Sequence, residues 1–257
     1  KIFIGLGIVV LVAAIGAAVV LSGVLVRPTE AALKSYKAVE SYQILDYQFQ
    51  REQEILKDYR SGKYTLQNPY VIQDPYQANP LSAFVIFETE QPALTQVIVV
   101  GKDANTTFIH QYQQPKTHHE IAVLGLYAGA NNKVRINVQS SGKPDQSVEL
   151  TIKTEALPFD FPKLDVAVSK PEAMEAGVTL MIACFETSYT YMLDARGEVR
   201  GYFSNKFFGH GTAMRVLSNG RLLATGDVMK LMPYNMYTLW EMNLMGKVYV
   251  EYEVPNA

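Results

Sequence analysis

Four histidines carry most of the potential for chemistry in this sequence, because imidazole titrates near neutral pH and can act as nucleophile, base or metal ligand. His118 and His119 are neighbours in "PKTHHEIAVLG", at the start of a predicted strand. Consecutive side chains of a strand point to opposite faces, so these two rings cannot readily share one metal ion. We therefore expect a solvated strand end here, and we expect His110, within "TTFIHQY", to occupy an exposed polar position.

His210 has the surroundings that come closest to those of a functional site. It lies between two glycines in "FFGHGTAMRVLSNGRLLATG", directly before a predicted strand. Propeller proteins line their central channel with residues from such strand starts. His210 is therefore our candidate for a substrate-channel residue, and a structural role in the loop is the alternative.

Other features of the sequence exclude several classes of function. Cys184 is the only cysteine, so the chain can form neither an internal disulfide nor a cysteine-rich metal site. No Gly-rich phosphate loop, G-x-S-x-G motif or H-E-x-x-H motif is present. The 23 basic and 25 acidic residues are nearly balanced, which argues against a nucleic-acid-binding surface. We expect neither a cofactor nor a bound metal ion.

The first residues predict a membrane anchor. From Ile2 to Val26 no residue is charged, and such a run can cross a bilayer core of about 30 Å as a helix. A cleaved signal peptide has a shorter apolar core, of roughly 7–15 residues. We therefore predict a retained single-pass anchor over residues 1–27 in the inner (cytoplasmic) membrane. The β domains would then lie on the extracytoplasmic side, either periplasmic or outer.

A membrane-proximal helix is predicted over residues 28–62. Pro28 suits a first helical turn, and neither glycine nor proline occurs from residue 29 to residue 60. Residues at helical spacing form one stripe along this helix, namely Ala38, Tyr42, Leu45, Phe49, Glu52, Leu56 and Tyr59. The stripe either packs on the chain's own downstream domain or pairs with another chain in a homo-oligomer.

The remaining sequence predicts a mainly β fold in two parts. Short apolar runs bounded by turn residues suggest a small β-sandwich over residues 63–157, with strands at "LSAFVIFE", "TQVIVVG", "TTFIHQY", "EIAVLGLY", "KVRINVQ" and "SVELTIK". Residues 158–257 contain two similar units, "MLDARGEVRGYF" and "EMNLMGKVYVEY". They indicate a repeat of about 50 residues, the length of one four-stranded propeller blade. Because two blades cannot close a ring, we predict a linker followed by an incomplete β-propeller.

Four stretches, taken in order, carry a resemblance to a known family: "NPYVIQDPYQANPLSAFVIFETEQPA", "VLGLYAGANNKVRI", "YMLDARGEVRGYF" and "LWEMNLMGKVYVEYEVP". They resemble the bacterial arylsulfate sulfotransferases from about residue 67 to residue 257. The resemblance implies a β-sandwich followed by the first blades of a six-bladed propeller. It also implies PAPS-independent transfer of a sulfuryl group from phenolic sulfate esters to phenols, through a sulfohistidine.

The resemblance assigns no catalytic residue in this chain. In the family, further histidine and arginine residues of the channel donate protons and stabilise the sulfate oxygens, which suits imidazole as nucleophile and guanidinium as an anion ligand. None of the four histidines here matches a catalytic position of the family. The first channel histidine of the family would follow Ala257.

Two hypotheses follow from the sequence. The first is the N-terminal portion of a membrane-anchored aryl sulfotransferase, inactive alone because its catalytic residues lie beyond this chain. The alternative is a non-enzymatic, membrane-anchored binding or assembly module that pairs through its helix and through an open β edge.

Overall fold

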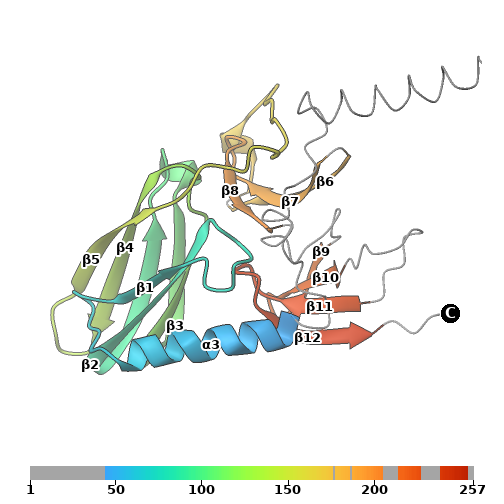
Figure 1. The fold of residues 1–257 in the computed structure, drawn as a ribbon. Helices are drawn as coiled ribbons and strands as arrows, with labels where there is room; N and C mark the ends of the chain where they lie inside the picture. The colour runs from blue at the N-terminus through green and yellow to red at the C-terminus, as the bar shows by residue number, and fades with distance from the viewer. Residues whose placement is uncertain (1–43, 176, 186, 205–213, 227–237, 254–257) are drawn as a thin grey trace, which may run out of the picture. The chain divides into compact units, whose positions relative to one another are not determined.

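The computed structural model describes residues 44–175, 177–185, 187–204, 214–226 and 238–253. All of them belong to one compact unit, Val39–Ala257. The predicted anchor over residues 2–26 and the first part of the predicted helix lie outside the described residues. Within the described residues, no helix combines the length and apolar character needed to span a membrane. The fold is mainly β, as predicted (Figure 1).

Helix α3 (Ile44–Arg60) is the one α-helix of the described chain, and it packs against its own unit (Figure 1). Its buried face consists of Ile44, Gln48 and Ile55. The predicted stripe is only partly right, because Leu45 and Phe49 are 38% and 61% exposed whereas Glu52, Leu56 and Tyr59 are half-buried. The helical spacing of apolar residues alone is compatible with burial of either face of the helix. The face that is buried carries Gln48, whose side-chain amide forms hydrogen bonds with the backbone of Gly246 and Val248 in a distant hairpin. Packing on the chain's own domain is confirmed for this helix.

One curled five-stranded sheet follows the helix, in place of the two sheets of the predicted sandwich. Its strands are β1 (Tyr70–Gln73), β2 (Ser82–Val99), β3 (Phe108–Leu124), β4 (Asn131–Ser140) and β5 (Gln146–Lys153). The first half of β2 pairs with β1 and β3, and its second half pairs with β3 and β4. A single long strand thus connects the two ends of the sheet.

The predicted strand boundaries in this region were wrong at two points. Four runs were predicted as separate strands, but two of them form the single strand β2 and the other two form the single strand β3. The predicted breaks between the runs correspond to an irregularity in strand register between Glu88 and Ala93. Pro92 lies within this irregular stretch of β2, and Pro115 lies in β3 close to Lys116, the partner of Ala93. Proline cannot donate a ladder hydrogen bond, so it marks a bulge here where the sequence suggested a turn.

Two further antiparallel sheets follow the linker. The first contains β6 (Thr179–Phe185), β7 (Thr187–Leu193) and β8 (Val199–Tyr202). The second contains β9 (Met214–Val216), β10 (Leu222–Gly226), β11 (Thr238–Met242) and β12 (Val248–Glu253). Two short 3₁₀ turns, η2 (Ala104–Thr106) and η3 (Pro171–Ala173), complete the described secondary structure.

The two units of the predicted repeat both form a hairpin, and the two hairpins have the same turn. In β7–β8 the Asp194 side chain accepts hydrogen bonds from the backbone N–H groups of Arg196 and Glu198. In β11–β12 the Asn243 side chain accepts the equivalent bonds from Met245 and Lys247. Each turn also contains a glycine with positive φ, Gly197 at 77° and Gly246 at 84°, which a residue with a Cβ rarely adopts.

The sheets share their hydrophobic cores. One core lies under the five-stranded sheet and includes Tyr189, Tyr191 and Tyr202 from β7 and β8. A second core surrounds the fully buried Trp240 of β11 and includes Ile44 of α3. The hairpins are therefore packed into the same unit as the sheet and the helix.

Candidate functional site

His118 and His119 of β3 point to different environments, as their adjacency predicts. His118 is exposed, with Nδ1 at 2.6 Å from Glu88 Oε1 and Nε2 at 3.4 Å from Glu120 Oε1. His119 is buried, with its ring nitrogens at 3.0 Å and 2.8 Å from the hydroxyls of Thr89 and Thr95. The expectation of a solvated strand end is therefore wrong for His119, because β3 continues through this position and carries the ring into the sheet.

These surroundings move the two pKa values in opposite directions. Desolvation acts to lower the pKa of His118, but the hydrogen bond with Glu88 and the charges of Glu88 and Glu120 raise it overall. Desolvation lowers the pKa of His119. In the described part of the chain, no group of three or more histidine, cysteine or acidic residues could hold a metal ion.

The other two histidines add no catalytic grouping within the described part of the chain. His110 is exposed on β3, as predicted, and its ring makes an edge contact with Tyr112 at 4.8 Å between ring centres. His210, the predicted channel residue, lies outside the described residues. The three described histidines therefore do not assemble into one site.

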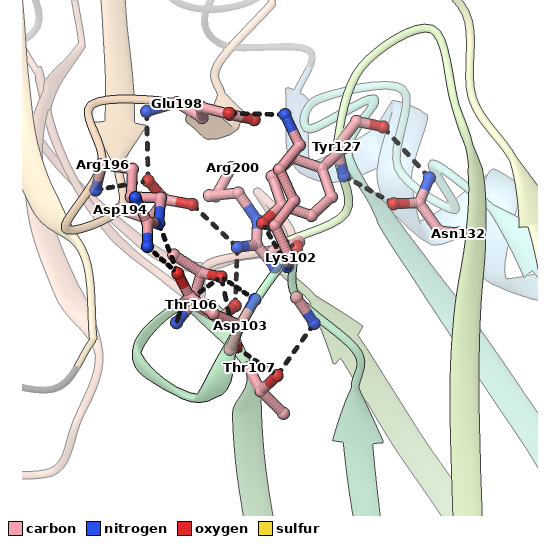
Figure 2. A network of polar contacts seen from close by, with 12 residues as sticks. Lys102, Asp103, Thr106, Thr107, Tyr127, Asn132, Asp194, Arg196, Glu198 and Arg200 are labelled. Carbon is pink, nitrogen blue, oxygen red and sulfur yellow. Dashed lines mark hydrogen bonds and ion pairs between the residues drawn. The ribbon is translucent and has the colours of Figure 1, made fainter. Parts of the chain in front are cut away.

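Arg200 of β8 is the centre of a buried polar network (Figure 2). Its side chain is fully buried, and its Nη1 donates to Asp194 Oδ2 at 2.9 Å. Nη1 also donates to the Thr106 carbonyl at 2.7 Å, and Nε donates to the Gly125 carbonyl at 2.8 Å. A buried guanidinium needs such partners because burying an unpaired charge is costly. Arg200 therefore joins the β7–β8 hairpin to the two ends of β3.

Aromatic rings cover both faces of this guanidinium. Its Cζ lies 4.3 Å from the ring centre of Phe108 and 3.8 Å from that of Tyr127. Arginine stacks well between aromatic faces because its planar cation interacts with the electrons of the rings. The Tyr127 backbone is held in turn by Asn132, whose side chain accepts from the Tyr127 N–H at 2.7 Å and donates to its carbonyl at 3.0 Å.

Exposed ion pairs surround the buried arginine (Figure 2). Lys102 Nζ lies 2.5 Å from Glu198 Oε1, and Arg196 pairs with Asp103. Asp103 also caps the 3₁₀ turn η2, since its side chain accepts from the Thr106 N–H. Exposed pairs of this kind contribute little to stability, so the buried Arg200 contacts dominate the network.

A second junction attaches the β11–β12 hairpin to helix α3. Gln48 Nε2 donates to the Gly246 carbonyl at 2.7 Å, and the Val248 N–H donates to Gln48 Oε1 at 2.7 Å. Glu52, one turn further along the helix, pairs with Lys247. The single Gln48 amide thus satisfies a donor and an acceptor of the hairpin backbone.

Sequence reasoning missed both Arg200 and Gln48. A signal was present for Arg200, since it is a charged residue inside the strand "EVRGYF" next to a turn of the repeat. No comparable signal marks Gln48, because a glutamine within a helix is ordinarily exposed.

Comparison with known families gives two matches that follow one another along the chain. Residues 70–155 match the arylsulfotransferase Ig-like domain, and residues 164–257 match the arylsulfotransferase (ASST) domain. The chain belongs to the arylsulfotransferase family. Comparison with curated individual proteins gave no match. In this chain, Thr106 and Gly125 lie in the Ig-like segment whereas Asp194 and Arg200 lie in the ASST segment, so the Arg200 network joins the two family domains.

Proposed function

We propose that this protein transfers a sulfuryl group from a phenolic sulfate ester to a phenol without PAPS. The observation that carries the proposal is the match of two consecutive family domains, in order, over residues 70–155 and 164–257. The β6–β8 and β9–β12 sheets would be the first blades of a six-bladed propeller. The four-stranded antiparallel β9–β12 sheet has the composition of one such blade.

The proposed chemistry proceeds in two displacements at sulfur. An imidazole nitrogen attacks the sulfur of the aryl sulfate, the bond between sulfur and the aryl oxygen breaks, and the phenolate leaves and takes a proton. The oxygen of the acceptor phenol then attacks the sulfohistidine, the N–S bond breaks, and the acceptor gives up its proton. A nucleophile that forms a covalent intermediate needs a free nitrogen lone pair in reach of substrate.

The described residues would serve this reaction as a scaffold. His118 is engaged by two carboxylates and His119 by two threonine hydroxyls, so neither ring is placed as a free nucleophile. His110, the third described histidine, lies in the Ig-like segment and not in the ASST segment, so we assign the attacking histidine to a position outside the described residues. The Arg200 and Gln48 junctions would hold the first blades in a fixed place against the Ig-like domain.

The proposed setting is a membrane, with residues 2–26 as a single-pass anchor and the β domains on the extracytoplasmic side. Support for this location comes from the uncharged run alone. Phenolic donors and acceptors would then be reached outside the cytoplasm, where PAPS is not supplied.

The test is a transfer assay with an aryl sulfate donor and a phenol acceptor, without PAPS. We expect the full-length gene product to show ping-pong kinetics and a trapped histidine that carries one SO₃ group. A His210→Ala variant of the full-length product tests whether that residue lines the channel. Absence of transfer by the full-length product, or a requirement for PAPS, would refute the proposal.

A further inference from the structure

A cavity of about 600 Å³ lies beside the Arg200 side chain. Val97, Phe108 and Tyr112 of β2 and β3 line one side, and Met192 of β7 and Leu244 of the β11–β12 turn also line it. Sites for small organic molecules have volumes of about 300–1,000 Å³ and mainly apolar or aromatic walls with a few polar groups. The size and lining of this cavity fall within that description.

Arg200 contributes a hydrogen-bond donor for which no described residue supplies an acceptor. Its Nη2 is buried and makes no hydrogen bond with any described residue, although Nε and Nη1 are both paired. In the planar guanidinium Nη2 lies on the same edge as Nε, and Arg200 and Gly125, whose carbonyl accepts from Nε, are both among the residues that line the cavity. A buried donor without an acceptor is destabilising, so an oxygen atom supplied from the cavity would be bound favourably.

Tyr112 contributes a second donor to the same cavity. Its hydroxyl oxygen accepts a hydrogen bond from the Ala122 N–H at 2.9 Å, and no described residue accepts the hydroxyl proton. Burial raises the pKa of Tyr112, so the hydroxyl keeps this proton at neutral pH. Both unpaired groups are donors, and the complementary group of a ligand is therefore an acceptor oxygen.

The charge of the site distinguishes a neutral ligand from an anion. Asp194 already pairs with Arg200, and Glu175 also lines the cavity, so a bound anion would place a further negative charge close to carboxylates. We propose that this cavity binds a small uncharged aromatic molecule through one acceptor oxygen, such as the carbonyl oxygen of an aryl ketone or ester. The aromatic ring would lie among Phe108, Val97 and Met192, and the oxygen would face the two donors.

The test compares three ligands of similar size by isothermal titration calorimetry on the full chain. Acetophenone has both the ring and the acceptor, ethylbenzene lacks the acceptor, and cyclohexyl methyl ketone lacks the aromatic ring. We expect acetophenone to bind at least about tenfold more tightly than either of the others. Acetophenone carries neither a hydroxyl nor a sulfate, so its binding is independent of sulfuryl transfer and of the function proposed above.

Two variants change different walls of the cavity. Ala122→Leu fills space while Arg200 stays intact, and Tyr112→Phe removes the hydroxyl donor with little change of shape. We expect each variant to weaken acetophenone binding about tenfold or more, and we expect the exposed control Gln113→Ala, which lies outside the cavity, to bind as the unmodified chain does. Circular dichroism establishes that each variant is folded. Equal affinity for ethylbenzene, no binding of acetophenone, or undiminished binding by either folded variant would overturn the proposal.

Discussion

The β7–β8 and β11–β12 hairpins have the same turn but are attached to the rest of the protein by different chemistry. At the position six residues after the turn aspartate or asparagine, β8 has Arg200 and β12 has Tyr249. Arg200 is fully buried and binds carbonyls of the Ig-like segment, whereas Tyr249 is 40% exposed. The second hairpin is held by Gln48 of helix α3 instead.

This difference shows that a repeated local structure does not imply a repeated tertiary role. The shared turn depends on a side-chain acceptor and a glycine close together in sequence, and each hairpin can form it alone. The attachment depends on a residue whose partners are far away in sequence. Loss of either partner of a buried ion pair leaves an unpaired buried charge. Loss of the Gln48 amide leaves only uncharged backbone groups without partners.

The largest effect is expected for removal of the buried guanidinium. Arg200→Met leaves Asp194 as an uncompensated buried charge and leaves two carbonyls without donors, so we expect the free energy of unfolding to fall by about 3–5 kcal/mol. Urea denaturation followed by the fluorescence of Trp240, the only tryptophan, measures this change. The control Arg196→Met removes only an exposed pair and should cost less than about 1 kcal/mol. Equal losses in both variants would contradict the dominance of Arg200.

Exchanging the two turn residues tests the comparison directly. Asp194→Asn keeps the acceptor of the turn but removes the charge opposite Arg200, and we expect a loss of about 1.5–3 kcal/mol in unfolding free energy. Asn243→Asp keeps the same acceptor in a turn with no buried arginine, and we expect a change within about 0.5 kcal/mol. If the two exchanges had the same effect, the hairpins would differ less than their contacts suggest.

The two hydrogen bonds of the Gln48 side chain are expected to contribute less to the free energy of unfolding than the Arg200 network does. Gln48→Ala leaves the Gly246 carbonyl and the Val248 N–H without partners, which should cost about 1–3 kcal/mol in the same urea measurement. Gln50→Ala, on the exposed face of the helix, is the matched control and should be nearly neutral. A loss larger than that of Arg200→Met would reverse the order of the two junctions.

The smallest effect concerns the C-terminal end of helix α3, where Tyr59 donates to Glu88 at 2.8 Å and His118 contacts the same carboxylate oxygen. The pKa of His118 is raised in the folded state, so its contribution is present below the unfolded value of about 6.5 and is lost as pH rises through the folded pKa. His118→Gln should remove this dependence, with a change below about 1 kcal/mol because the ring is exposed.

For His119 we expect the opposite pH dependence of stability in the same kind of experiment. Its pKa is lowered on folding, so the neutral ring contributes stability above about pH 6.5, and this contribution declines as pH falls toward the folded pKa. His119→Gln should therefore reduce the loss of stability on acidification, measured as urea midpoints across pH 5–8. Identical pH profiles for the two variants would contradict the different environments of these neighbouring rings.

Features that depend on residues close together in the chain could be predicted from the sequence. The mainly β character, the repeated turn at Asp194 and Asn243, the exposure of His110 and the family resemblance could all be predicted. Alternation of apolar residues and turn chemistry act over a few residues, so they leave a direct trace in the sequence.

Where the sequence allows several local arrangements, contacts between distant residues select the one that is adopted. Pro92 is as compatible with a turn as with a bulge, and pairing of β2 with β3 on both sides of it favours the bulge. The buried face of α3 and the burial of Arg200 were likewise fixed by partners such as Gly246 and Gly125, which are distant in sequence. Buried polar groups must be satisfied wherever the fold places them, and the residues that satisfy them carry no local pattern.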